Sequence, residues 1–242
     1  MSELLDELRG GLIVSVQAWP GSALDDPHVI AAMARAAQEG DAVAVRVQGV
    51  ANLRAVRARV QVPIVGLIKR DYPGYEPYIT PTLDEVAAIA ETGADIVAFD
   101  ATARARPGST RLGGIVEAIH GAGRLAMADC ATLEEGRTAA ALGADLVATT
   151  LCGYTAETAG TPLPALDLVA ALRAVRGDGG ARTDTTFVVC EGGVHSPCQV
   201  RAALDAGADA VVVGTAITNV DWLVREFAGS TDTARNRYRY RP

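Results

Sequence analysis

The sequence of 242 residues contains a single lysine among its 22 basic residues, and the position of that lysine suggests chemistry. Lys69 follows residues 63–68, a segment without a polar side chain, and Glu191 follows a second apolar segment at 187–190. Arginine stays protonated in proteins, whereas a partly desolvated lysine releases its proton more readily. We therefore expect Lys69 and Glu191 to be two titratable groups that share the movement of a proton.

Other polar or small residues also stand where apolar segments end. Glycines at such points let backbone N–H groups approach an anion, so the pairs Gly192–Gly193 and Gly214–Thr215 are candidates for phosphate binding. A structural ion pair with Asp71 or Asp100 is the alternative role for Lys69, and Arg46 could pair with a phosphate or with an internal carboxylate. The further residues at the ends of apolar segments include Gln17, Arg46, Asp100, Asp129, Thr149 and Thr150.

A repeated pattern organises the chain into units that could position these residues. Gly40, Gly93, Gly143 and Gly207 each follow an alanine-rich segment and precede a β-branched run. Glycine adopts the left-handed conformation that ends a helix, and a continuous apolar run is typical of a strand buried on both faces. Four more apolar runs lie between these units. The sequence predicts strands near 12–17, 42–45, 63–69, 96–99, 124–129, 146–149, 186–191 and 210–213.

Helical segments alternate with the expected strands. Asp26, Thr82, Thr132 and Ser196 are expected to cap helices, because their side chains accept hydrogen bonds from the first free amides of a helix. The predicted helices cover about 26–38, 50–59, 83–92, 110–122, 133–142, 165–176, 196–206 and 219–228.

Eight strand–helix units in about 240 residues predict a closed (β/α)8 TIM barrel, in which reactive groups lie at the carboxyl ends of the strands. A doubly wound open sheet is the alternative. That fold usually has a GxGxxG turn after its first strand, whereas residues 17–21 read QAWPG. We expect residues 1–228 to form a single catalytic barrel and the Arg-rich residues 229–242 to form a mobile polar tail.

Composition and charge exclude several classes of protein. With 49% hydrophobic residues the chain can bury a large core, and a net charge of −7 argues against a nucleic-acid-binding protein. No apolar run approaches the roughly 18 residues that span a bilayer. The first residues carry acids before the first apolar run, unlike a secretory signal. We therefore expect a cytoplasmic protein without a nucleic-acid or membrane partner.

Metal chemistry is not expected. His28 and His120 fall in predicted helices, and we expect His195 to cap the helix that follows the seventh strand. A metal-dependent sugar-phosphate epimerase would require His and Asp ligands at several strand ends, and that set is missing from the sequence.

Several motifs resemble those of bacterial N-acetylmannosamine-6-phosphate 2-epimerases. The similarity runs in collinear order from about residue 8 to residue 228, and motifs of this length are more specific than a shared barrel. The matching segments are IVSVQA (13–18), IKRDYP (68–73), YITPT (78–82), DATARARP (100–107), MADCATLEEG (127–136), TTLCGYT (149–155) and Glu191–Gly192.

This resemblance implies that the protein interconverts N-acetylmannosamine 6-phosphate and N-acetylglucosamine 6-phosphate, a step of sialic acid catabolism. It implies that Lys69 is the acid/base lysine and Glu191 the essential carboxylate of the seventh strand. It also implies a homodimer that uses no metal or organic cofactor and binds a small sugar phosphate. The residues expected to contact substrate are Gln17, Arg46, Asp129 and Thr150.

Two positions depart from the family pattern near the expected phosphate end. Asn219 stands where the family commonly has arginine, and Gly193 stands where arginine or asparagine often follows Glu-Gly. Both departures bear on whether the phosphate is required.

Two other functions use the same residues. A Schiff-base sugar-phosphate aldolase or lyase also requires a lysine at the mouth of a barrel. A non-catalytic sugar-phosphate binding protein would use the same pocket without exchanging the C2 proton.

Overall fold

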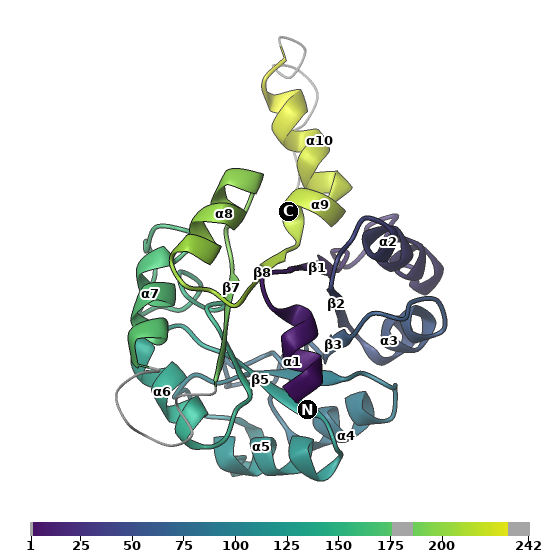
Figure 1. Cartoon of the computed structure of the whole chain (residues 1–242). Helices are drawn as coiled ribbons and strands as arrows, with labels where there is room; N and C mark the ends of the chain where they lie inside the picture. Colours follow the sequence, from purple (N-terminus) through teal and green to yellow (C-terminus); the bar gives the residue numbers. More distant parts are fainter. Residues whose placement is uncertain (1, 176–185, 232–242) are drawn as a thin grey trace.

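The computed structural model describes residues 2–175 and 186–231, and these residues form a closed barrel of eight parallel strands (Figure 1). Each strand pairs with its neighbours in the sequence, and β8 pairs with β1 to close the ring. The predicted (β/α)8 TIM barrel is confirmed, and the open-sheet alternative is wrong. The strands are β1 (Leu12–Val16), β2 (Ala44–Gln48), β3 (Ile64–Leu67), β4 (Ile96–Asp100), β5 (Leu125–Asp129), β6 (Leu146–Ala148), β7 (Phe187–Glu191) and β8 (Ala210–Val213).

Helices surround the barrel in the order that the sequence predicts (Figure 1). Two α-helices, α1 and α9, and the short 3-10 helix η1 were not predicted. The helices are α1 (Ser2–Leu8), α2 (Pro27–Glu39), α3 (Val50–Arg57), α4 (Leu83–Ala90), η1 (Pro107–Ser109), α5 (Leu112–Gly121), α6 (Leu133–Ala141), α7 (Leu166–Val175), α8 (Pro197–Asp205), α9 (Thr215–Thr218) and α10 (Val220–Gly229).

The predicted capping residues begin their helices. Asp26 accepts hydrogen bonds from the first amides of α2, and Ser196 accepts one from the Gln199 amide in α8. At α6, Thr132 and Glu135 accept from each other's backbone amides. These contacts satisfy amides that have no acceptor within the helix. His195, which the sequence analysis expects to cap α8, precedes the true cap.

The glycine stops are confirmed at three of the four repeats. Gly93, Gly143 and Gly207 have φ angles of 82°, 99° and 104°. At the remaining repeat Gly40 has φ −95°, and Asp41 adopts the left-handed conformation with φ 66°. The prediction for Gly40 is therefore wrong, because aspartate is among the few residues that tolerate this conformation.

The strands separate two buried apolar clusters. Within β2, Ala44 belongs to the cluster inside the barrel, whereas Val45 belongs to the cluster between strands and helices. Successive side chains of a strand point to opposite faces, so this alternation continues along each strand. α1 adds Leu8, fully buried, to the interior cluster, and the helix lies across the middle of the ring in Figure 1. The helix therefore covers the amino-terminal end of the barrel.

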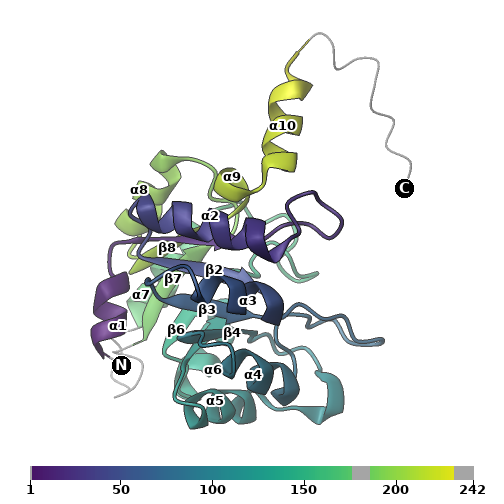
Figure 2. The ribbon, with the colours of Figure 1, turned by 90° about the vertical axis from the view of Figure 1, so that its right-hand side faces the viewer.

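The last described helix departs from the outer layer. α10 projects away from the barrel in both views (Figures 1 and 2), and none of its residues is buried. The predicted tail at 229–242 begins at the last residue of this helix, and residues 232–242 lie outside the described part of the chain. Among the helices of the described residues, none is long and apolar enough to cross a membrane.

Candidate active site

The two-residue period of the strands determines which polar side chains enter the barrel. Leu67, Met127 and Val189 belong to the interior cluster, and Lys69, Asp129 and Glu191 follow them by two residues. Ala44 and Ala148 place Arg46 and Thr150 in the same way. Because these strands are parallel, their carboxyl ends meet at one end of the barrel. The barrel therefore gathers polar groups from five strands above an apolar interior.

A pocket of about 270 Å³ opens above these residues. Eight predicted site residues line it, whereas Arg46 and Asp129 lie beneath it and are 1% and 0% exposed. Substrate contact by Arg46 and Asp129 therefore stays a prediction. In the structure Arg46 contacts Glu191 and Asp129 contacts Thr150, both of which line the pocket. The predicted residues in the lining are Gln17, Lys69, Thr150, Glu191, Gly192, Gly193, Gly214 and Thr215.

Arg46 connects the two carboxylates below the pocket. It donates two hydrogen bonds to Asp129, at 3.1 and 2.7 Å, and its Nη1 lies 3.1 Å from Glu191 Oε2. Burial lowers the pKa of Arg46, but Asp129 and Glu191 outweigh burial and raise it. The sequence left open whether Arg46 pairs with a phosphate or with an internal carboxylate. In the described structure it pairs with the internal carboxylates of Asp129 and Glu191. Such two-pronged pairing fixes the plane of the guanidinium and hence the position of both carboxylates.

The hydroxyl of Thr150 lies between the same two carboxylates, 2.7 Å from Asp129 Oδ1 and 3.2 Å from Glu191 Oε2. The backbone of Glu191 is held separately, because its N–H donates to Thr149 Oγ1 and its carbonyl accepts from the same hydroxyl. The Glu191 side chain is 13% exposed and faces the pocket. Arg46 and Thr150 therefore hold the side chain of Glu191, and Thr149 at the end of β6 holds its backbone.

The pKa of Glu191 is raised to about 7, chiefly by burial, with Asp129 adding to the shift and Arg46 opposing it. A carboxyl group with such a pKa exchanges its proton near neutral pH. This property suits a group that both accepts and donates protons during a reaction.

Lys69 extends into the pocket from the end of β3, and its side chain is exposed to the solvent of that pocket. Surrounding protein atoms and the positive charge of Arg46 lower the pKa of Lys69, while Glu191 and Asp129 oppose that shift. Among the described residues no carboxylate lies within ion-pair distance of Lys69. The alternative ion pair with Asp71 or Asp100 is therefore wrong, and the amine remains available to a ligand.

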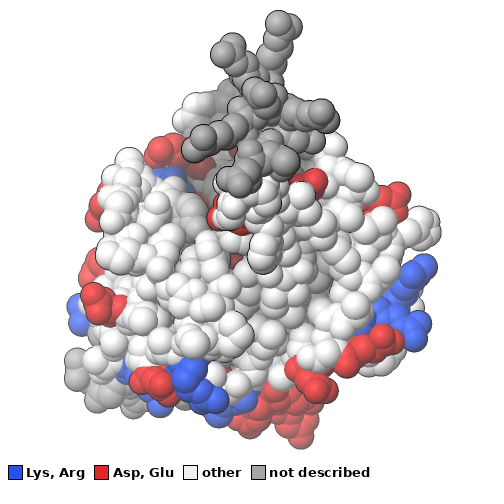
Figure 3. Space-filling view, turned by 90° about the horizontal axis from the view of Figure 1, so that it is seen from above, with Lys and Arg blue, Asp and Glu red and all other residues white. Residues whose placement is uncertain are grey.

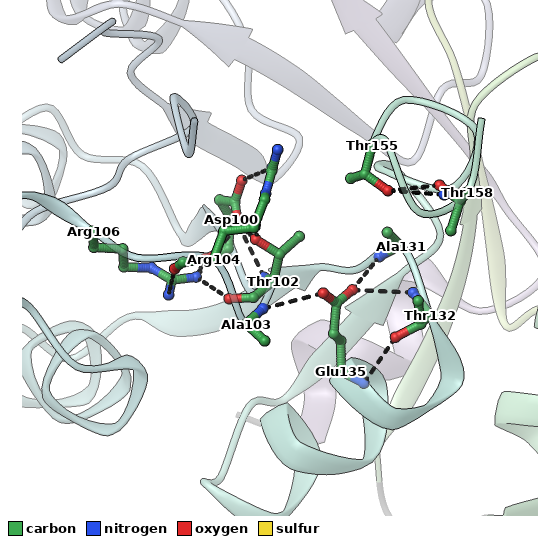
Figure 4. Close-up of polar contacts among 10 residues, drawn as sticks. All are labelled: Asp100, Thr102, Ala103, Arg104, Arg106, Ala131, Thr132, Glu135, Thr155 and Thr158. Atoms are coloured by element: carbon green, nitrogen blue, oxygen red, sulfur yellow. Dashed lines mark hydrogen bonds and ion pairs between the residues drawn. The ribbon is translucent and has the colours of Figure 1, made fainter. Parts of the chain in front are cut away.

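The carboxylate of Asp100 is hydrogen-bonded by residues of the loop that follows β4 (Figure 4). It is fully buried and accepts hydrogen bonds from Arg104 at 2.8 Å and from the Thr102 hydroxyl at 2.6 Å, and Arg106 lies 3.3 Å away. Glu135 on α6 accepts from the Ala103 amide at 3.1 Å. These contacts tie the loop after β4 to the start of α6.

A sequence model of the NanE family, described as "Putative N-acetylmannosamine-6-phosphate epimerase", matches residues 30–233. This match covers most of the chain. The chain belongs to the NanE family.

Individual relatives agree with this membership of the NanE family. A protein of Klebsiella pneumoniae (strain 342) named "Putative N-acetylmannosamine-6-phosphate 2-epimerase" is 49% identical over 88% of this chain and 86% of its own length. A protein of Yersinia pestis with the same name is 44% identical over 91% and 90%. A solved structure of the N-acetylmannosamine-6-phosphate 2-epimerase from Clostridium perfringens is 39% identical, covers 94% of this chain and 96% of its own, and has a TM-score of 0.87.

The structure gives a physical reason for one departure from the NanE pattern. Gly193 has φ 67°, and a Cβ at this position would lie 2.3 Å from the Cβ of Leu163. Leu163 therefore occupies the space that any larger residue would need. Asn219, the other departure, is 6% exposed and accepts a hydrogen bond from the Trp222 amide at the start of α10.

We expect the substitution G193A to lower the free energy of unfolding more than G74A does. Gly74 also has a positive φ, of 84°, but a Cβ there would meet nothing within 4 Å. Both variants carry backbone strain, and only G193A adds a steric clash, which contributes about 1–3 kcal/mol. Urea unfolding of the two variants measures the difference, and equal losses would contradict the packing against Leu163.

The raised pKa of Glu191 also predicts how stability changes with pH. The folded protein retains the Glu191 proton between its ordinary pKa and about 7, while the unfolded chain has released it. Unfolding therefore releases a proton in this window, and stability falls as pH rises through it. We expect the free energy of unfolding of the wild type, minus that of E191Q, to decrease from pH 5 to pH 8 in urea titrations. A difference that grows with pH would contradict the shift.

Sequence reasoning missed several residues that line the pocket. Trp19 and Tyr154 come from loops, and Tyr78 lies on a segment that forms a bridge beside Lys69. Burial and the charge of Asp129 raise the pKa of Tyr78. The motifs at residues 78–82 and 149–155 were signals for Tyr78 and Tyr154, whereas nothing in the sequence pattern distinguishes Trp19. Among the described residues no group of three potential ligands is placed to hold a metal.

Proposed function

We propose that the protein interconverts N-acetylmannosamine 6-phosphate and N-acetylglucosamine 6-phosphate, with residues 1–228 as its catalytic domain. The observation that carries this proposal is the placement of Lys69 and the Arg46-held Glu191 in one pocket. The raised pKa of Glu191, about 7, lets this carboxyl group exchange a proton near neutral pH, and the lowered pKa of Lys69 makes its neutral amine more accessible than that of an ordinary lysine.

The reaction inverts the carbon that carries the acetamido group. In the open-chain sugar this carbon lies next to an aldehyde, and the C2 proton is acidic because the carbonyl oxygen accepts the electron pair as an enolate. Neutral Lys69 removes the C2 proton from one epimer and so forms the enolate. In the reverse reaction the protonated Lys69 gives the proton back to C2 of the enolate on the same face and regenerates that epimer. Protonation of C2 on the opposite face then gives the other epimer. Glu191 orients the sugar and transfers protons during ring opening or on the opposite face.

The remaining site residues hold the substrate. The amide oxygen of Gln17 is buried and has no hydrogen-bond partner within the described residues, although its nitrogen donates to Ser15 at 2.8 Å. This oxygen accepts a sugar hydroxyl or the acetamide N–H. Thr150 adds a hydroxyl beside Glu191, and Asp129 acts with Arg46 at the base of the pocket.

The phosphate occupies the end of the pocket formed after β7 and β8. Gly192 and Gly193 have positive φ angles of 105° and 67°, and Gly193 lies beyond the β7–β8 ladder, which ends at Glu191 and Val212. The amide of Thr215 begins α9 and has no intrahelical acceptor. Backbone amides from two neighbouring strand ends are suited to surround a phosphate oxygen.

Proton NMR in deuterium oxide tests the proposed reaction directly. With N-acetylmannosamine 6-phosphate we expect the C2 proton to be replaced by deuterium as the product forms. An adduct on Lys69 after borohydride treatment would instead indicate a Schiff-base lyase. Binding of the sugar phosphate without exchange at C2 would indicate a non-catalytic binding protein.

We infer that the protein works as a homodimer in the cytoplasm, in the catabolism of sialic acid. α10 supports a second copy as partner, because Val220, Val224 and Phe227 on this helix are 49%, 59% and 75% exposed. The face seen in Figure 3 is largely free of charged side chains, which gather toward its rim. The V224D/F227D variant is expected to be monomeric in light scattering, and a dimer of unchanged stability would contradict this assignment.

A further inference from the structure

His195 is a pocket residue to which the proposed reaction assigns no role, and the capping role expected for it belongs to Ser196. It follows Gly192–Gly193 in the loop after β7 and lines the pocket together with Gly214 and Thr215. Among the described residues in the lining, Lys69 and His195 are the side chains that can carry a positive charge. Lys69 follows β3, whereas His195 lies in the same loop as Gly192 and Gly193.

The imidazole of His195 is positioned from two sides but has free ring nitrogens. Its ring lies 5.1 Å from the ring of Trp222, at an angle of 59°, and its backbone N–H donates to Gln199 Oε1 at 2.8 Å. Within the described residues neither ring nitrogen has a hydrogen-bond partner. Packing against Trp222 therefore fixes the direction of the imidazole, and its ring N–H remains available to donate a hydrogen bond to a ligand in the pocket.

The position of Trp222 depends in turn on Asn219. The side-chain oxygen of Asn219 accepts the Trp222 amide hydrogen at 2.9 Å and so caps α10. A longer cationic side chain at this position has no oxygen with which to accept that hydrogen bond. Asn219 therefore stabilises the helix start that places Trp222 against His195.

Arg225, the basic residue of α10, is directed away from His195 and toward Trp19. Its guanidinium carbon lies 5.0 Å from the centre of the Trp19 ring, and Arg225 is not part of the pocket lining. Trp19 itself lines the pocket, so Arg225 packs against a residue of the pocket wall and does not enter the pocket.

We propose that the imidazole N–H of His195 donates a hydrogen bond to the phosphate of the substrate and thereby selects phosphorylated sugars. Asn219 and Trp222 act as positioning residues for that contact. This inference rests on the phosphate location given under Proposed function. Hydrogen bonds to a charged group contribute more than neutral ones, so the contact discriminates between a phosphate and a hydroxyl at C6.

Kinetics of H195A, H195N and H195Q test the proposal, with H28A as the control for loss of an exposed histidine. For N-acetylmannosamine 6-phosphate we expect the KM of H195A to rise about ten- to hundredfold with kcat little changed. One of the two amide variants, which keep a side-chain N–H, should recover much of the loss. Inhibition by unphosphorylated N-acetylmannosamine should be the same in wild type and H195A. An unchanged KM, or equal weakening of both sugars, would overturn the role of His195.

Amide chemical shifts separate this inference from the phosphate location. On titration with inorganic phosphate, the Gly193 and Gly214 signals of the wild type are expected to move. If they move and the KM of H195A equals that of the wild type, His195 has no such role although the location is correct. If these signals do not move, the location itself is wrong and the inference fails with it.

Discussion

Replacing Lys69 with alanine is expected to lower kcat for epimerisation by about 10²–10⁴-fold while the barrel remains folded. Lys69 lies at the pocket, its side chain is exposed there, and it makes no ion pair within the described residues. Its removal therefore takes away a proton acceptor without leaving a buried partner unpaired. The measurement is the rate of C2 exchange and of product formation in deuterium oxide, with circular dichroism to verify folding.

The variant K69R is the matched control for charge. Arginine keeps the positive charge and much of the length of the side chain but does not release its proton at neutral pH. We expect K69R to be as inactive as K69A. Near-normal epimerisation by either variant would show that another group removes the C2 proton.

Replacing Arg46 with alanine is expected to lower the free energy of unfolding by about 3–5 kcal/mol, because it leaves buried carboxylates without their counter-charge. Arg46 is 1% exposed and lies within hydrogen-bonding distance of Asp129 and Glu191. The same change is expected to reduce activity, because Glu191 loses the group that positions it. Urea unfolding monitored by circular dichroism measures the first effect.

The variant R35A provides the comparison for Arg46. Arg35 and Glu39 form an ion pair at 2.8 Å on α2, with side chains 63% and 60% exposed. An exposed pair of this kind contributes less than about 1 kcal/mol. If R46A and R35A lose the same stability, the buried network of Arg46, Asp129 and Glu191 contributes no more than an exposed ion pair.

Much of the barrel could be predicted because its signals are local. The apolar run before Lys69 and the run before Glu191 both form strands, and Thr132 caps its helix as its spacing from Glu135 predicts. The short helix α1 was missed, because seven residues form a stable helix only when they pack on other elements. Its Leu8 becomes buried under the barrel, which is a tertiary contact.

The sequence could predict which residues lie near the pocket but not how their side chains pair with one another. Strand ends identify Arg46, Asp129 and Glu191 as neighbours of the pocket, and the alternation of side chains explains why all three point inward. Their mutual pairing depends on the register between β2, β5 and β7. Asp100 has the same position on its strand, yet Arg104 and Arg106 from the following loop neutralise it.

The amino-acid sequence alone determined the eight strand–helix units, most helix caps and the solitary lysine at a strand end, because each depends on residues close together in the chain. Only the tertiary structure decided that Arg46 lies beneath the pocket between two carboxylates, that Lys69 has no ion pair within the described residues, and that His195 rests against Trp222. These contacts join segments far apart in the sequence, and closure of the barrel sets the distances between them.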